Sequence, residues 1–427
     1  MLTDLIKPLL SFLGIEKTLN LERVLLNSGW LFLDNIIRLF IGLAVTTFLA
    51  RYLGPDNFGR FNYALAFVSL FSTFAIFGLN EIVVRVLVED QQRRNDILVT
   101  AFSLRCFAGC VALISCLFFI NRFGPTDGVS RSLVDIIAVG LIFQAFDVID
   151  SYFQSQLLSK YTIWVKNSIF VILSFLKLYL IFIKASLIAF AWVGLAESVC
   201  GAIGLLIAAR AINVITGNFR FDKTIAVLLI KSCWPIILSG IAFAFNMRID
   251  QVMLEYFKGP HEVGVYSLAV KISEIWYALG VIIASAFPII VKLKNENEII
   301  YHLKLRQLYK VLYFLGFLAS LITIILAKPV FHLLFGSAYE QSIPVLMIHV
   351  LGLTVILFGG ATTYILIAEN LQKYQLYRTL IGCISNVIFN LIFIPRWGVQ
   401  GAAWASVISY TVCVYSIYLF KPARKIL

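Results

Sequence analysis

The chain has 427 residues, of which 60% are hydrophobic and only 14% are charged, and its formal net charge is +12. Soluble domains keep about 25% of their residues charged, so this chain has too little polar surface to be a soluble protein. Apolar stretches recur along the whole length, and no hydrophilic segment is long enough to fold separately. This pattern favours a membrane-embedded bundle over a soluble domain with a single anchor.

The first twenty residues do not have the pattern of a signal peptide. Asp4, Pro8 and Glu16 interrupt the apolar run, and no cleavage site of small residues follows. We interpret residues 1–20 as an amphipathic segment on the inner surface of the membrane.

Apolar windows between charged or Gly/Pro-containing breaks predict an all-α polytopic membrane protein with about twelve spanning helices. The predicted spans are 24–50, 61–87, 97–120, 131–158, 161–183, 186–210, 224–254, 263–291, 308–335, 341–368, 373–394 and 401–420. In the connections, the side of the N terminus has nineteen Lys and Arg and the opposite side has eight. Both termini are therefore expected in the cytoplasm, which requires an even number of spans. The basic charge is a topology signal, and no nucleic-acid partner is expected.

An internal duplication is the most specific feature of the sequence. Residues 54–61 read Gly-Pro-Asp-Asn-Phe-Gly-Arg-Phe, and residues 259–266, at an offset of 205, read Gly-Pro-His-Glu-Val-Gly-Val-Tyr. Each copy is expected to be a tight turn in which Pro fixes φ and both glycines adopt angles that a side chain would forbid. Weaker echoes join residues 158–161 to 371–374 and 191–192 to 403–404.

The duplication predicts two lobes of six helices. The N-lobe would occupy residues 21–215, the C-lobe residues 216–420, and a cytoplasmic tail residues 421–427. The seven cysteines lie in apolar stretches without a CxxC pair, so they are expected to pack as small hydrophobes, and no metal or cofactor is predicted.

Ionisable residues inside the predicted spans mark candidate sites, because each costs on the order of 3 kcal/mol at mid-bilayer. Those on the first two helices of each half are Asp34, Arg38, Glu81, Lys231, Arg248, Asp250, Lys271 and Glu274. These helices occupy equivalent places in the two lobes, so they are expected to line a polar cleft between the lobes. The segments 341–368, 379–394 and 401–420 contain no charged residue and are expected to face lipid or to pack without polar contacts.

Some of these charges also have purely structural interpretations. Asp34 with Arg38, and Lys271 with Glu274, have helical spacing and could neutralise each other as ion pairs. Lys177 and Lys231 are interpreted as reaching towards an interface. Glu197 lies near the middle of its span and is interpreted as a lone carboxylate, either protonated or a proton relay.

The Gly-Pro turn and its second copy resemble the polysaccharide-biosynthesis flippases, the lipid-linked repeat-unit (Wzx-type) translocases of the multidrug/oligosaccharidyl-lipid/polysaccharide (MOP) superfamily. A C-terminal pattern is also similar to that family: Asn386-x3-Asn390-x4-Pro395-x2-Gly398-x2-Gly401-Ala402-Ala403. The resemblance implies a MATE-like, two-lobed inverted V. It also implies outward movement of undecaprenyl-pyrophosphate-linked oligosaccharide, such as an O-antigen unit, across a bacterial cytoplasmic membrane.

The resemblance further implies a cationic cavity that meets the pyrophosphate, and the positions that fit it are Arg38, Arg248 and Lys271. The acids Asp34, Glu81, Glu197, Asp250 and Glu274 would then balance charge or couple transport to H⁺ or Na⁺. Membrane lipids and the polysaccharide polymerase machinery are the other partners that this interpretation suggests.

Two other classes of protein fit the sequence less well. A MATE-type antiporter for organic cations would need a cavity dominated by carboxylates and aromatics, whereas Lys and Arg prevail on the seventh and eighth predicted spans. A polysaccharide polymerase or ligase would need a large outer loop, but the longest outer connection is about ten residues, 121–130, without His. For this reason a transporter rather than an enzyme is expected. No Walker sequence is present, so ATP is not expected as a direct ligand.

Overall fold

The computed structural model describes residues 19–76, 78–212, 220–280, 283, 298–369 and 371–424, with side chains from Arg38 onward in the first helix. The described residues are helical, without a strand. Residues 1–18 of the predicted segment 1–20, the Asp34 side chain and the proposed lobe boundary at 215 lie outside this description.

The helices of the first half follow the predicted spans closely. Their bounds are α2 Leu19–Ile76, α3 Leu79–Glu89, α4 Arg94–Phe123, α5 Gly128–Phe143, the 3₁₀ turn η1 Gln144–Phe146, α6 Asp147–Ser155, α7 Ser159–Phe182 and α8 Leu187–Ala211.

The helices of the second half end in a short C-terminal turn. Their bounds are α9 Lys223–Lys258, α10 Pro260–Glu274, η2 Ile275–Leu279, α12 Glu298–Leu334, η3 Ser337–Tyr339, α13 Ser342–Val350, α14 Leu353–Ala368, α15 Gln372–Tyr415, η4 Ser416–Leu419 and α16 Lys421–Arg424. The largest difference from the predicted spans is at α12, which begins ten residues before the predicted 308 because the helix continues through Lys304 and Arg306 beyond the apolar window.

Eight of the described helices are long and apolar enough to cross a membrane, or nine if the bent pair α13 and α14 counts as one span. Two of them, 38–89 and 372–419, are 52 and 48 residues long. At 1.5 Å per residue these lengths are about two and a half times the 30 Å hydrocarbon core. Each contains a glycine with non-helical angles, Gly54 (φ 67°) and Gly398 (φ 56°), where two helices meet. The protein is therefore a multi-pass membrane protein, and each of these two segments is long enough to cross twice.

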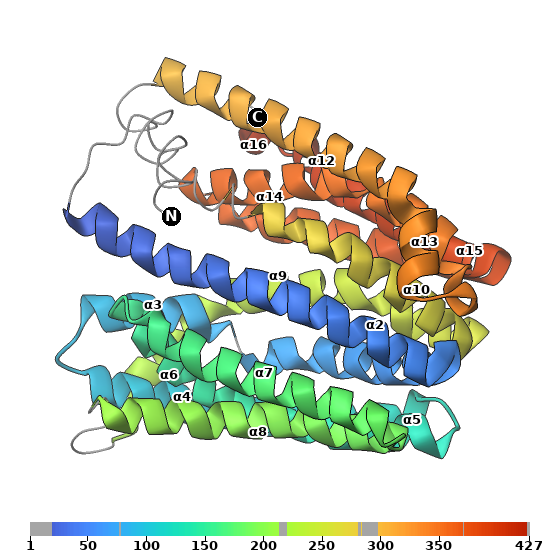
Figure 1. Ribbon diagram of the computed structural model, residues 1–427. Helices are drawn as coiled ribbons and strands as arrows, with labels where there is room; N and C mark the ends of the chain where they lie inside the picture. The colour runs from blue at the N-terminus through green and yellow to red at the C-terminus, as the bar shows by residue number, and fades with distance from the viewer. Residues whose placement is uncertain are drawn as a thin grey trace.

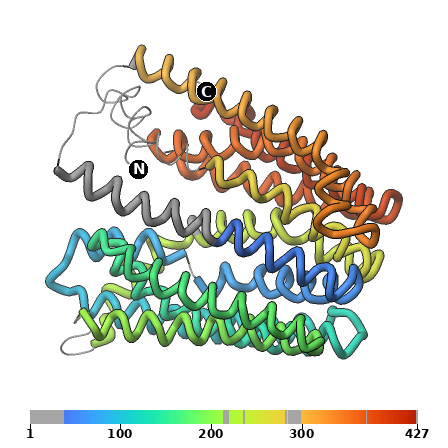
Figure 2. The backbone as a smooth tube through the Cα atoms, in the orientation of Figure 1, coloured from blue at the N-terminus to red at the C-terminus, as the bar shows by residue number. Residues whose placement is uncertain are grey.

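The helices form two groups that share a central set (Figure 1). Helices α3 to α8 lie together on one side, α12 to α16 lie on the other, and α2, α9 and α10 lie between them. The tube in Figure 2 shows the coloured part of α2 running to one end of the molecule, where the chain turns back at the bend that Gly54 makes.

The two copies of the duplicated turn pack against each other where α2 meets α10. A Cβ atom on Gly59 would lie 1.8 Å from the Pro260 carbonyl oxygen, and one on Gly264 would lie 2.0 Å from that of Pro55. These two glycines have helical angles, so the expectation that each needs an unusual backbone conformation is wrong for them. Their role is close approach. Gly54 and Gly259 do have positive φ, with space around the missing side chain.

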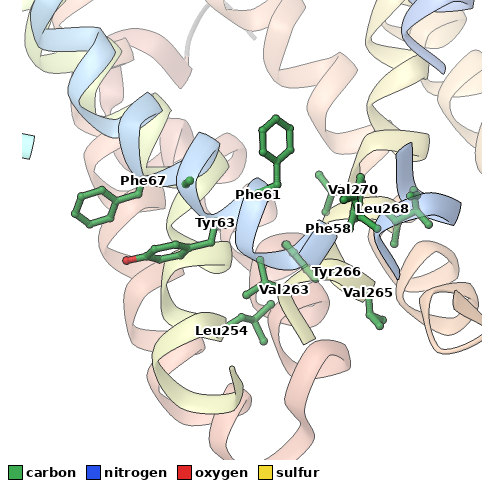
Figure 3. Close-up of a cluster of buried hydrophobic side chains, with 14 of the residues drawn as sticks. Phe58, Phe61, Tyr63, Phe67, Leu254, Val263, Val265, Tyr266, Leu268 and Val270 are labelled. Atoms are coloured by element: carbon green, nitrogen blue, oxygen red, sulfur yellow. The ribbon is translucent and has the colours of Figure 1, made fainter. Parts of the chain in front are cut away.

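Apolar packing and a few polar contacts surround this meeting of the two turns, which we call the turn contact (residues 54–61 and 259–266). Figure 3 shows Phe58 and Phe61 of α2 beside Val263 and Val265 of α10 within one buried cluster. The Tyr339 hydroxyl donates a hydrogen bond of 2.9 Å to the Ala50 carbonyl. Asp56 and His261, the residues that follow each proline, lie 3.3 Å apart. Equivalent positions of the repeat thus meet face to face.

Candidate functional site

Two basic side chains lie at matched depth on adjacent helices. Arg248 is 11 residues before Gly259 and Lys271 is 12 residues after it. At 1.5 Å per helical residue, each lies roughly 17 Å from the turn, near the middle of a 30 Å hydrocarbon core. The α9–α10 hairpin therefore brings two cations to one level of the bundle.

These two cations have different surroundings. Arg248 Nη1 lies 3.3 Å from Glu274 Oε1, so Glu274 pairs across the hairpin rather than with Lys271, as its spacing had suggested. Lys271 is half-buried, with its Nζ 5.3 Å from the centre of the Phe58 ring on α2. Among the described residues, the Lys271 ammonium has no hydrogen-bond or ion-pair partner. A cation held this way is available to an anionic ligand.

A second ion pair extends the group towards α7 and α8. Lys177 Nζ lies 3.3 Å from Glu197 Oε2, and both side chains are partly exposed. The interpretations of Glu197 as a lone carboxylate and of Lys177 as reaching an interface are therefore wrong, because the two helices are adjacent and the chains meet. Lys271 lies within electrostatic range of Lys177, Arg248 and Glu274. We call these five residues the charged cluster: three bases and two acids from α7, α8, α9 and α10.

Arg38 is placed beside this cluster and not within it. Its guanidinium lies 5.0 Å from the centre of the Phe170 ring on α7. It lines a pocket of about 250 Å³ between α2, α5, η1, α6, α7 and α8, which also includes Glu197. Arg248 and Lys271 do not line that pocket. Arg38, Arg248 and Lys271 were expected to line one cleft. The structure instead places Arg38 in the pocket and the other two in the charged cluster, and Glu197 belongs to both.

Asp250 has a different environment. It is 1% exposed, and three side chains donate hydrogen bonds to its carboxylate: Tyr266 Oη at 2.8 Å, Ser406 Oγ at 2.6 Å and Asn390 Nδ2 at 2.5 Å. Asn390 Nδ2 also donates to Asn386 Oδ1 at 2.9 Å. This is a buried carboxylate held by neutral donors, as the physics of charge burial requires.

The Asp250 network corrects one expectation about the uncharged C-terminal spans. They were predicted to face lipid or to pack without polar contacts, yet α15 contributes Asn386, Asn390, Ser406 and Ser409 to a buried polar face. The search for charged residues missed these amides and hydroxyls. The signal was the spacing Asn386 to Asn390, four residues apart on one helical face.

Glu81, another of the predicted acids, does not join the charged cluster. Glu81 is exposed on α3 and acts electrostatically on Arg105 of α4. In the first half, Lys166 on α7 pairs with Asp147 at 2.8 Å and with Asp150 at 3.4 Å. Within the described residues, no three His, Cys, Asp or Glu side chains are grouped in a way that could hold a metal ion.

Comparisons with known proteins agree with this architecture. A family model described as "polysaccharide biosynthesis protein" matches residues 24–294, more than half of the chain. The capsular polysaccharide biosynthesis protein CapF of Staphylococcus aureus is 24% identical over 406 residues, which is 92% of this chain and 98% of the relative.

Solved structures show the same fold. The inward-facing form of a multidrug resistance MATE family transporter of the MOP superfamily matches with a TM-score of 0.75 and 14% identity, over 91% of this chain and 95% of that one. The lipid II flippase MurJ in an inward closed conformation matches with a TM-score of 0.74 and 17% identity, over 94% and 89% of the two chains. The predicted MATE-like, all-α membrane fold is confirmed.

Proposed function

Since this chain belongs to the polysaccharide biosynthesis protein family, we propose that it is a flippase for an undecaprenyl-pyrophosphate-linked oligosaccharide. It would move the sugar head group from the inner to the outer leaflet of a bacterial cytoplasmic membrane, with both of its own termini in the cytoplasm. A transporter role follows from the family and the fold; the lipid-linked substrate and the direction are our proposal.

The physical task explains what such a protein must provide. Each sugar hydroxyl stripped of water costs on the order of several kcal/mol, so the head group cannot enter hydrocarbon unaided. The polyprenyl tail can remain in lipid throughout. The protein must therefore offer polar groups at mid-membrane depth, including cations for the pyrophosphate.

The observation that carries the proposal is Lys271 with Arg248. The two bases lie at one level on adjacent helices, and Lys271 has no hydrogen-bonding partner among the described residues. The charged cluster has three bases for two acids, so it retains a positive charge before cargo binds. Such a centre attracts a pyrophosphate and repels an organic cation, which favours this cargo over that of a multidrug antiporter.

The turn contact supplies the gate in this proposal. With termini in the cytoplasm, residues 54–61 and 259–266 lie at the outer face, where the glycines let the two halves touch and close that side. Rocking the halves apart at this contact would open the cluster to the outer leaflet. With the inside negative, outward movement of an anion is downhill by about 2.3 kcal/mol per charge per 100 mV.

Asp250 is our candidate for ion coupling. Its carboxylate lies two residues beyond Arg248 on α9, so binding of H⁺ or Na⁺ there would change the charge beside the cargo site. The donors Tyr266, Ser406 and Asn390 could reorient around an added ion, because hydroxyl and amide oxygens are also acceptors.

Depletion of the protein in its own cells tests this function. We expect lipid-linked repeat units to accumulate on the inner leaflet, as measured by enzymatic labelling of sealed spheroplasts. Accumulation of single units on the outer leaflet would instead identify a polymerase. Wild-type levels on both leaflets, together with sensitivity to organic cations, would identify an antiporter and contradict the proposal.

A further inference from the structure

The pocket beside Arg38 lies between helices of the first half and shares only Glu197 with the charged cluster. Its volume is about 250 Å³, and it lies where the span 128–155 is interrupted by the 3₁₀ turn η1. Turns of this kind inside a helix often mark functional positions. Here the interruption places Gln144 in the pocket wall, and its Oε1 is buried without a hydrogen-bond partner among the described residues.

Glycines on α8 keep the pocket open. A Cβ on Gly194 or Gly201 would meet nothing within 4 Å, and neither residue has positive φ. By contrast, a Cβ on Gly204 of the same helix would lie 2.6 Å from Val165, so that glycine serves packing. Glycine inside a helix costs about 1 kcal/mol relative to alanine. Neither backbone conformation nor close packing requires a glycine at position 194 or 201. The space that their missing side chains leave is part of the pocket.

The polar lining is balanced in charge. Arg38 and Lys166 are offset by Asp147 and Glu197, and Gln144 and Ser198 add neutral groups. Lys166 already pairs with Asp147, and Glu197 with Lys177. A wall with equal numbers of bases and acids favours a neutral ligand whose groups both donate and accept hydrogen bonds, as sugar hydroxyls do. Pyrophosphate, by contrast, fits the surplus positive charge at Lys271.

We propose that this pocket binds one sugar ring of the cargo, while Arg248 and Lys271 hold its pyrophosphate. The inference rests on the proposed function and names a second part of its site. The two parts adjoin, because Glu197 lines the pocket and its partner Lys177 acts electrostatically on Lys271. The pocket is smaller than the 300–1,000 Å³ of sites for drug-sized ligands, which suits a single ring, and is about eight times the 30 Å³ share of one water.

Binding of two lipids to the purified protein in nanodiscs tests this division. The probes are undecaprenyl pyrophosphate and the same lipid carrying one N-acetylglucosamine. We expect wild-type protein to bind the sugar-bearing lipid about tenfold more tightly, as one or two well-placed hydrogen bonds would produce. Gly194→Val and Gly201→Val fill the pocket and should reduce this ratio to about one without weakening the bare lipid. Gly128→Val, where a Cβ also meets nothing within 4 Å but which lies outside the pocket, should retain the ratio.

Each other outcome overturns the inference. A wild-type ratio of one, or an unchanged ratio in both filled variants, excludes a sugar site here. Equal loss of both lipids would make the pocket part of the pyrophosphate site, and loss of ²²Na⁺ binding with a retained ratio would make it a cation site. Failure of the proposed function is distinguishable, because wild-type protein would then bind neither lipid.

Discussion

The turn contact and the charged cluster are both places where the two halves meet, yet they are built in opposite ways. At the turn contact, backbone touches backbone, and Gly59 and Gly264 leave no room for even a methyl group. In the cluster, long charged side chains span the space between helices and remain partly exposed. A closely packed backbone contact cannot be separated by a small distance without losing its packing, so the turn contact is either closed or open. The cluster can exchange partners gradually.

The difference suggests a division of roles. The turn contact decides which side of the protein is open, and the cluster decides what is carried. Substitutions at the turn contact should change gating and leave cargo binding intact, and substitutions in the cluster should do the reverse. A substitution in the Asp250 network tests the stability of the fold beside them.

Gly59→Val should have the largest effect. A Cβ atom at position 59 would already lie 1.8 Å from the Pro260 carbonyl oxygen, and the rest of the valine side chain adds to this overlap. The two halves therefore cannot close at the turn contact. We expect export of surface polysaccharide to fall to background while binding of undecaprenyl pyrophosphate to the purified protein persists. Gly264→Val should act in the same way, because the contact is reciprocal.

Gly128→Val is the matched control, since a Cβ there meets nothing within 4 Å. If Gly59→Val and Gly128→Val exported polysaccharide equally well, the turn contact would have no part in gating.

Asp250→Ala should lower stability by about 2 kcal/mol, because it leaves buried donors on Asn390 and Ser406 with fewer acceptors. The measurement is the melting temperature of the purified protein. Asp250→Asn preserves the shape and a carbonyl acceptor, so it should melt close to wild type while removing any H⁺ or Na⁺ dependence of transport. Equal melting of Asp250→Ala and wild type would show that the network does not stabilise the fold.

Lys271→Met should weaken binding of undecaprenyl pyrophosphate about tenfold, or about 1.4 kcal/mol, by removing one charge-assisted contact. Its melting temperature should not fall, because the ammonium has no described hydrogen-bond partner to leave behind. Lys231→Met, on the exposed surface of α9, is the matched control and should bind as wild type. Unchanged affinity in Lys271→Met would remove Lys271 from the site.

Much of the fold could be predicted from the sequence because the bilayer imposes a simple rule on span length and polarity. The all-helical membrane fold and the positive φ of Gly54 and Gly259 follow from local composition. The pairing of charges could not be predicted, because it depends on which helices are neighbours. Lys177 on α7 pairs with Glu197 on α8. Glu274 pairs with Arg248 on the neighbouring helix and not with Lys271, which is closer to it in the sequence. The pocket could not be predicted either. A glycine that leaves open space and a glycine that permits close packing cannot be distinguished in the sequence.

The smallest effect is expected at Asp56 and His261, which occupy equivalent positions in the two turns and form a polar contact with each other. Both side chains are exposed, at 65% and 44%, and exposed pairs of this kind contribute about 0.2–1 kcal/mol. A double-mutant cycle of Asp56→Asn and His261→Asn, measured by thermal stability, should give a coupling energy in that range. The glycines would then close the turn contact by shape, with the Asp56–His261 contact only at its rim. A coupling well above 1 kcal/mol would reverse this conclusion, because the turn contact would then depend on charge, as the cluster does.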